Sequence, residues 1–165
     1  MDEQHRRQRR EGRTTQTWRR FLHEVAKGCA VDVAQAERAA VYALEVLESR
    51  LMKEEARDLN AQLPTGLVEL LPLPHERPER LHRAGFLGRM AERMDVDVLE
   101  AERLCRGVFE VVSRRVSEGE LEDVLRELPA ELRTLWPAQL VAEVDRHEAQ
   151  DRFRAERNRG EHLPS

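Results

Sequence analysis

The 165-residue sequence contains few aromatic residues, only two lysines and no isoleucine. Aromatic residues make up 4% of the chain and hydrophobic residues 40%, so the core must be built mainly from leucine, valine and alanine. Arginine in place of lysine, together with leucine and valine in place of isoleucine, indicates the codon bias of a GC-rich genome. This bias weakens the interpretation of any arginine cluster as a nucleic-acid site.

The sequence also lacks the features that mark several protein classes. Two cysteines, Cys29 and Cys105, are too few for a disulfide scaffold. No apolar run approaches the length of a transmembrane helix and there is no signal-peptide core, so we expect a cytoplasmic protein with no membrane partner. Glycine-rich phosphate loops and the motifs Cys-x-x-Cys and His-Glu-x-x-His are absent as well. We therefore expect no enzymatic activity, no metal site and no cofactor.

What the sequence does contain is an internal duplication. Residues 21–72 align without a gap with residues 86–137, and 19 of the 52 aligned pairs are identical. A match of this length at a fixed offset of 65 residues is typical of repeated structural units. Because a unit of this size buries little apolar surface by itself, we expect the two repeats to pack together.

Hydrophobic spacing predicts four helices in each repeat. Apolar residues recur at helical intervals over residues 15–27 and 33–51 of the first repeat, and a shorter helix is expected over residues 53–62. A fourth helix is expected to begin at Pro64 and, in the second repeat, at Pro129, because proline suits the first turn of a helix. The predicted fold is all-α: two tandem pseudo-symmetric four-helix repeats packed together, plus a C-terminal helix.

Composition sets the expected boundaries of these units. They are a disordered Arg-rich arm (1–13), helical repeat 1 (14–72), a Pro-rich linker (73–80), helical repeat 2 (81–137), and a C-terminal helix and tail (138–165). The first helix of repeat 1 should begin near Thr14 or Thr15, and its counterpart at Pro78 or Glu79. Closely spaced prolines predict a stiff, extended linker.

Several charged residues are identical in the two repeats and have a structural interpretation. Asp32 and Asp97 each precede a predicted helix, and we expect them to cap its N-terminus rather than to meet as a metal or catalytic pair. Arg50 and Arg115 end the second helix of each repeat, where we expect salt bridges to acidic residues of the third helix. Those acidic residues are Glu55 and Asp58 in repeat 1, and Glu120 and Asp123 in repeat 2.

Two repeated Glu-Arg pairs have two possible roles. They are Glu37-Arg38 and Glu102-Arg103, one turn into the second helix of each repeat and beside its core face. One interpretation is an ion pair between helices, such as Arg38 with Asp58. The other is that the two pairs face each other near a pseudo-two-fold axis and bind a partner or an anion, because arginine makes bidentate contacts to carboxylate and phosphate.

The N-terminal arm is a second candidate binding site. It contains Arg6, Arg7, Arg9 and Arg10, and residues 1–20 carry seven arginines against three acidic residues, although the whole chain has a net charge of −4. Because the rest of the chain is acidic, binding of a polyanion would fall to the arm alone. The alternative is a solvated tail, which is favoured by the lack of aromatic residues between the arginines.

Four motifs of the first repeat carry a resemblance to a known family. They are F-L-x-x-V-A from Phe21, V-D-x-x-x-A-E-R-A from Val31, E-V-L-x-x-R-L from Glu45 and E-A-x-D-L-x-x-Q-L-P from Glu55. As a set they resemble a bacterial family of unknown function, domain-of-unknown-function family 2267, in which the pattern occurs twice. The resemblance covers about residues 18–137. It implies a small all-helical protein with two repeats and no established activity.

These observations favour a non-enzymatic helical interaction module. We expect it to bind another protein, or a second copy of itself, through a groove between the repeats that includes Glu37, Arg38, Glu102 and Arg103. One alternative is binding of nucleic acid or another polyanion through the arm. The other is a small-ligand binder or enzyme that uses carboxylate and arginine side chains between the repeats.

Overall fold

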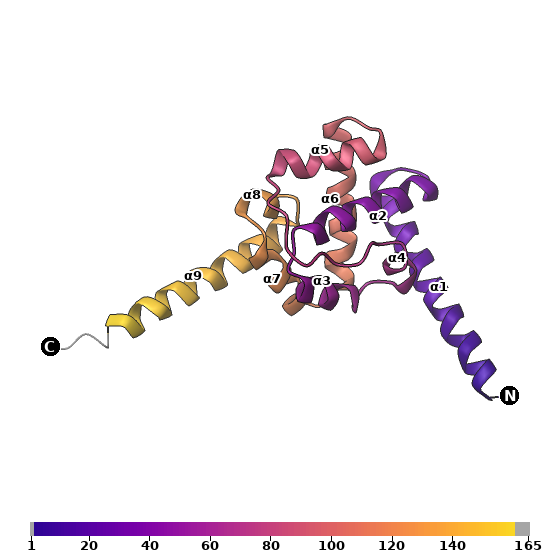
Figure 1. Ribbon diagram of the computed structural model, residues 1–165, viewed down its shortest axis with the longest axis horizontal. Coiled ribbons are helices and arrows are strands. Elements are labelled where there is room, and N and C mark those ends of the chain that lie inside the picture. Colours follow the sequence, from indigo (N-terminus) through magenta and orange to yellow (C-terminus); the bar gives the residue numbers. More distant parts are fainter. Residues whose placement is uncertain (1, 161–165) are drawn as a thin grey trace.

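The computed structural model describes the backbone of residues 2–160 and the side chains of residues 2–8 and 16–160. Over these residues the chain forms nine helices and no strand, which confirms the predicted all-α class (Figure 1). The helices are α1 (Asp2–Cys29), α2 (Val33–Ser49), α3 (Lys53–Asn60), α4 (Thr65–Val68), α5 (Arg83–Met94), α6 (Val98–Arg115), α7 (Glu118–Glu127), α8 (Ala130–Arg133) and α9 (Ala138–Gly160).

Helices α2 and α6 form the centre of the body. They contact each other, and each of them also contacts both α1 and α5 (Figure 1). Small residues in the first halves of α2 and α6, such as Ala36, Ala40 and Cys105, are fully buried there. Small side chains allow helices to approach closely, so one continuous core is built from both halves of the chain.

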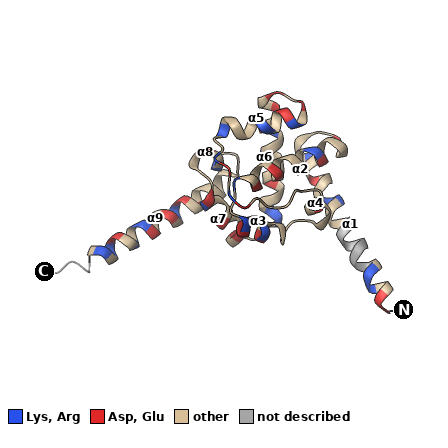
Figure 2. Cartoon of the chain, viewed as in Figure 1, with Lys and Arg blue, Asp and Glu red and all other residues tan. Residues whose placement is uncertain are grey.

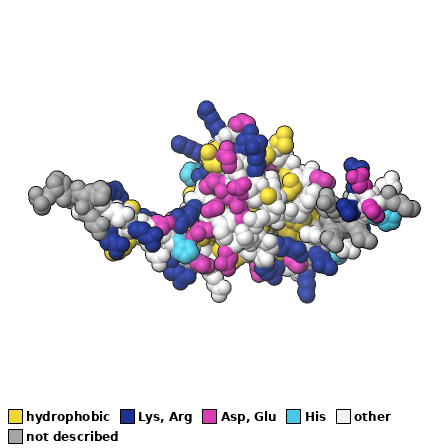
Figure 3. All heavy atoms as spheres, turned by 90° about the horizontal axis from the view of Figure 1, so that it is seen from below, with side chains coloured by type: hydrophobic (Ala, Val, Ile, Leu, Met, Phe, Trp, Pro, Cys, Tyr) yellow, Lys and Arg dark blue, Asp and Glu magenta, His cyan; other side chains and the backbone are white. Residues whose placement is uncertain are grey.

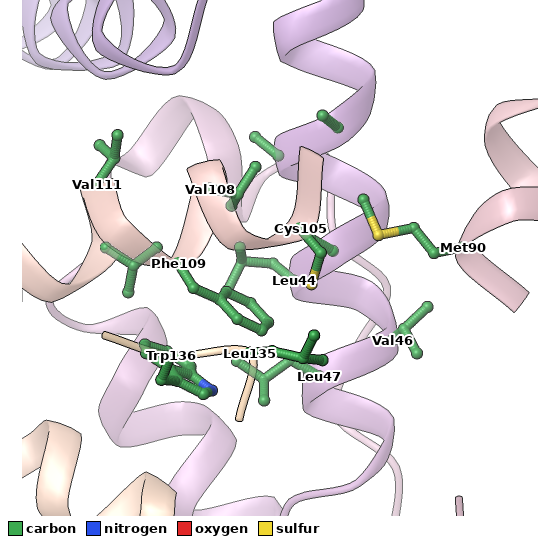
Figure 4. Close-up of a cluster of buried hydrophobic side chains, with 14 of the residues drawn as sticks. Leu44, Val46, Leu47, Met90, Cys105, Val108, Phe109, Val111, Leu135 and Trp136 are labelled. Atoms are coloured by element: carbon green, nitrogen blue, oxygen red, sulfur yellow. The ribbon is translucent and has the colours of Figure 1, made fainter. Parts of the chain in front are cut away.

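Large side chains fill the other end of this core. Leu44 and Leu47 of α2 lie near Phe109 of α6 in Figure 4, and all three are buried. The Phe109 ring stacks on Trp136 with 4.2 Å between ring centroids and an interplanar angle of 9°. This stack connects α6 to the segment between α8 and α9.

The helix starts follow the duplication. Helices α6, α7 and α8 begin 65 residues after α2, α3 and α4, which is the offset of the sequence alignment. The shared starts have local causes, since the capping aspartates and the Leu-Pro pairs are identical in both halves. The fourth helices are shorter than expected, with four residues each.

The N-terminal segment differs from its prediction. We expected a disordered arm over residues 1–13 and a helix start near Thr14, whereas the backbone is helical from Asp2 onward as part of α1. Arginine and glutamine have good helix propensity and no proline interrupts the segment. Extending a helix is far easier than nucleating one, and the core-bound half of α1 supplies the nucleus.

The start of α5 also differs from its prediction. It begins at Arg83 and not at Pro78 or Glu79. The amide of Glu79 donates a hydrogen bond to the carbonyl oxygen of Ser49 at 2.7 Å, which holds the preceding segment against the end of α2. This tertiary contact keeps the backbone out of a helix up to His82, which is the residue before α5.

Helix α9 is attached mainly through polar contacts. Val144 is its one buried residue. Arg133 of α8 is 8% exposed, donates to the carbonyl oxygen of Leu125 at 2.8 Å, and forms ion pairs with Asp145 at 3.1 Å and Glu148 at 2.5 Å. Beyond these contacts α9 extends away from the body, as the N-terminal part of α1 does (Figure 1). None of the helices in the described part of the chain is both long enough and apolar enough to cross a membrane.

Candidate functional site

The two repeated arginines contact the ends of helices in the opposite half of the chain. Arg38 of α2 donates to the carbonyl oxygens of Met94, at 3.4 Å, and Arg93, at 3.5 Å, which end α5. Arg103 of α6 donates to the carbonyl oxygen of Cys29, which ends α1. Because Cys29 and Met94 are equivalent positions of the duplication, these two contacts are reciprocal.

Such contacts stabilise helix C-termini. The last carbonyl groups of a helix lack partners within the helix and carry partial negative charge, which a guanidinium group satisfies. The ion pair that we considered between Arg38 and Asp58 does not occur among the described side chains, since Arg38 reaches α5. Each arginine therefore fastens one half of the chain to the other.

The two glutamates beside these arginines have different surroundings. Glu102 accepts hydrogen bonds from Arg106, at 3.0 Å, and from Arg83, and these contacts hold its pKa below the usual value, with Arg106 contributing most. The positions equivalent to Arg83 and Arg106 are Trp18 and Val41 in the first repeat, so Glu37 has no matching partners. The Glu-Arg pairs are thus unequal, and their role as a binding groove stays a prediction.

The capping role of the two aspartates is confirmed. Asp32 accepts a hydrogen bond from the amide of Gln35 at 2.7 Å, and Asp97 accepts one from the amide of Glu100 at 2.8 Å. Both aspartates are exposed N-caps of α2 and α6. Pro64 is the N-cap residue of α4, and its counterpart Pro129 is the N-cap residue of α8.

The salt bridges expected from Arg50 and Arg115 are not found. Arg115 pairs instead with Glu24 of α1 at 2.8 Å, and its guanidinium carbon lies 6.0 Å from the centroid of the Phe21 ring. Arg50 forms no ion pair with any side chain that the structure describes, and its Nε atom is buried without a hydrogen-bond partner. Among the described side chains, neither arginine forms an ion pair with Asp58 or with its counterpart Asp123.

Carboxylate groups gather where α3 and α7 pack against each other. Glu55, Glu120 and Asp123 each place one oxygen atom within 4.8 Å of the others. Asp58 lies close enough to raise the pKa of Glu55 by its charge. Because Glu55 and Asp58 are the equivalents of Glu120 and Asp123, the cluster contains both copies of a repeated Glu-x-x-Asp motif.

Backbone contacts hold α3 and α7 in place around this cluster. The amide of Met52, the N-cap residue of α3, donates to Glu127 Oε1 at 2.7 Å. The amide of Ser117, the N-cap residue of α7, donates to Gln62 Oε1 at 2.8 Å. Met52 is equivalent to Ser117 in the duplication, and Gln62 is equivalent to Glu127. The start of each helix is therefore bound by a side chain from the other half of the chain.

The electrostatics of the cluster are unusual for carboxylates. Burial, followed by the hydrogen bond and charge of Glu120 and the charges of Asp123 and Asp58, raises the pKa of Glu55 from 4.5 to about 8. Such a group holds a proton at neutral pH and shares it with its neighbour. The sequence contained the signal, a Glu-x-x-Asp motif kept in both repeats, but we had assigned its acidic residues to salt bridges.

The N-terminal arginines lie away from this cluster. Arg6 and Arg7 are exposed on the extended part of α1 (Figure 2). The predictions for Arg9 and Arg10 concern side chains that lie outside the described residues. The arm arginines, the Glu-Arg pairs and the carboxylate cluster are therefore three separate candidate sites.

Comparison with known proteins identifies a family for most of the chain. A family described as "Uncharacterized conserved protein (DUF2267)" matches residues 18–135. No curated protein matches the sequence. The match spans more than half of the chain and includes α2 to α8, with the reciprocal arginines and the carboxylate cluster. The chain therefore belongs to the DUF2267 family.

Proposed function

We propose that this protein is a non-enzymatic helical interaction module that binds another protein. The observation that carries the proposal is the extension of α9 beyond the body, where every residue from 151 to 160 is exposed (Figure 1). Phe153 on this segment is 67% exposed. An isolated helix of this length is only marginally stable in water, so a partner that covers it would stabilise it.

The spacing along α9 places Phe153 on the side away from the body. The docked side contains Val144, which is buried, and His147 and Asp151, which pair with residues of α7. Phe153 comes about two and a half helical turns after Val144 and so lies on the opposite side of the helix. A partner whose groove takes a helix would use Phe153 as its aromatic anchor.

Capture from a lysate of the native cells tests this proposal, with the captured protein then identified and purified. We expect binding of that protein to be lost in Phe153→Ala and retained in the matched control Leu73→Ala, which truncates a side chain that is 89% exposed on the linker. Equal binding by both variants would show that α9 is not the interface. Separate alanine variants of Glu37, Arg38, Glu102 and Arg103 would reveal a groove between the repeats if they weakened binding at a temperature where each variant remains fully folded.

The charge distribution favours binding of a polyanion as a second candidate function. Residues 1–20 contain seven arginines and three acidic residues, and residues 146–160 contain five arginines and three acidic residues, in a chain with a net charge of −4. The N-terminal part of α1 and the C-terminal part of α9 therefore carry net positive charge, while the rest of the chain is acidic. Basic extensions on an acidic body concentrate any attraction for phosphate groups on the helices themselves.

Binding of duplex DNA and RNA, measured by fluorescence anisotropy over a range of salt concentrations, tests the second candidate. Each lost phosphate contact should reduce the slope of log K against log salt by about 0.9 on DNA. We expect the double variant Arg6→Glu with Arg7→Glu to bind much more weakly than wild type. The matched control, Arg57→Glu with Arg114→Glu, reverses two exposed charges on the body and should bind only slightly less. Equal losses in the two variants would reject a role of the arm.

A further inference from the structure

We propose that the exposed face of α9 binds a second copy of this chain, through an antiparallel pairing of the two α9 helices over residues 142–160. This inference rests on the proposed function, since it names the partner that the exposed part of α9 would bind. It also goes beyond the family, because α9 follows the matched residues 18–135. In two views the outer part of α9 stands clear of the other helices that the structure describes (Figure 1, Figure 3).

Six residues of α9 form one face of this segment, which we call the outer face. They follow one another at intervals of four, three, four, three and four positions, which keeps them on one side of a helix. The six are Ala142, Arg146, Ala149, Phe153, Glu156 and Gly160, and all of them are exposed. Val144 and Asp151, which contact the body, are not among them, so the outer face stays accessible while α9 is docked.

The intervals of the outer face are the same when they are read in either direction. Two copies of α9 can therefore pair in antiparallel orientation about a two-fold axis that passes near Asp151. The contacts are then between residues 142 and 160, 146 and 156, and 149 and 153 of the two copies. Because a two-fold axis repeats each contact, every one of these pairs occurs twice in the dimer.

The side chains that meet in this pairing are complementary. Arg146 meets Glu156 of the second copy, and Phe153 meets Ala149, whose small side chain leaves room for the ring. A parallel pairing would instead bring Arg146 opposite Arg146 and Glu156 opposite Glu156. Since like charges at a helix contact are unfavourable, the charges select the antiparallel orientation.

The base of α9 has room for the end of the second helix. An open hollow of about 670 Å³ lies there between α6, the end of α8 and α9, and both Ala142 and Asp145 line it. The antiparallel pairing places Arg157 of the second copy opposite Asp145. Asp145 already pairs with Arg133, but its side chain is 60% exposed and can accept a second arginine.

The size of the contact indicates how firmly the two copies would associate. The paired segments of residues 142–160 are about 27 Å long, or roughly five helical turns. Such an interface is smaller than those of most stable complexes, and it contains one aromatic side chain from each copy. The balance between monomer and dimer should therefore depend on the concentration of the chain.

Sedimentation equilibrium of the full chain at concentrations from about 1 µM to 1 mM tests the proposal. Arg146→Glu and Glu156→Arg should each raise the dissociation constant of the dimer by about tenfold or more, because each reversal turns two attractive contacts into repulsive ones. An equimolar mixture of the two variants should dimerise as tightly as wild type. Arg154→Glu, the matched control, reverses an exposed arginine about a third of a turn from the outer face and should keep the wild-type constant.

Recovery in the mixture can come only from contact between chains, since residues 146 and 156 of one helix are about 15 Å apart. Wild-type constants for both single variants, or a mixture that associates as weakly as each variant alone, would overturn the proposal. So would a wild-type chain that stays monomeric over the whole range. In that case the proposed function stands if capture of another protein from the lysate requires Phe153, and it fails as well if Phe153→Ala leaves capture unchanged.

Discussion

Glu48 is a buried carboxyl group whose substitution should change the pH dependence of stability. The residue lies near the end of α2 and is 5% exposed. Its Oε1 atom accepts a hydrogen bond from Asn60 Nδ2 at 2.9 Å, while Oε2 is buried without a partner. Burial raises the pKa of Glu48 from 4.5 to about 7, although the hydrogen bond from Asn60 acts in the opposite direction.

The sign of the effect follows from proton binding. Between pH 4.5 and 7 the folded chain keeps the proton on Glu48 while the unfolded chain loses it, so the folded state binds more protons and stability falls as pH rises. The contribution is present in full below pH 4.5 and is lost once the pH passes 7. A difference of 2.5 between the two pKa values corresponds to about 3 kcal/mol in the free energy of unfolding.

Glu48→Gln removes this titration, keeps an oxygen for Asn60 and preserves the volume of the side chain. We expect the variant and the wild type to have similar stability at about pH 4.5, and the variant to be more stable by about 3 kcal/mol at pH 8. That gain corresponds to a rise in melting temperature of roughly 6–12 °C. Urea unfolding at several pH values measures the difference directly. Glu69→Gln, which changes an exposed glutamate, is the control and should show little dependence on pH.

An equal difference in stability between Glu48→Gln and wild type at pH 4.5 and at pH 8 would refute the raised pKa of Glu48. A constant difference would mean that Glu48 has the same pKa in the folded and unfolded chain. Glu48 would then be ionised inside the folded chain at neutral pH, and solvent would have to reach its Oε2 atom.

Three further changes test the core, the reciprocal contacts and the caps. Phe109→Ala removes a buried ring stacked on Trp136 and should cost about 3–5 kcal/mol, or roughly 6–20 °C in thermal melting; a loss below about 3 °C would contradict the shared core. Arg103→Ala should cost about 1 kcal/mol and speed amide hydrogen exchange in the last turn of α1, and Arg38→Ala should do the same for α5; unchanged exchange would show that these arginines do not hold the helix ends. Asp97→Ala should lower the stability in urea by about 1 kcal/mol while Asp97→Asn changes it little, and equal losses would mean that the side-chain cap is not the cause.

The features that could be predicted are those with a local cause. Asp32 and Asp97 were assigned as caps because a capping side chain bonds to a backbone amide within the same turn. The starts of α2, α3, α6 and α7 followed from the same kind of signal together with the spacing of apolar residues.

The predictions that failed concern contacts between segments far apart in the chain. Arg115 was expected to pair with the helix that follows it, but it reaches Glu24, 91 positions earlier. The start of α5 was misplaced because the bond from Glu79 to Ser49 overrides the helix signal of Pro78. No pattern within a short window encodes such contacts, since they depend on the angle and register at which helices pack.

The sequence by itself determined the all-α class, the duplication and the caps, because each depends on residues within a few turns of one another or on the comparison of the two halves. The tertiary structure decided which charged residues meet. It placed Arg38 and Arg103 on the ends of the opposite half's helices, and it brought Glu55 together with Glu120 and Asp123. The physical reason is that long polar side chains reach whatever group the packed helices bring near them, and only the packed core sets that arrangement.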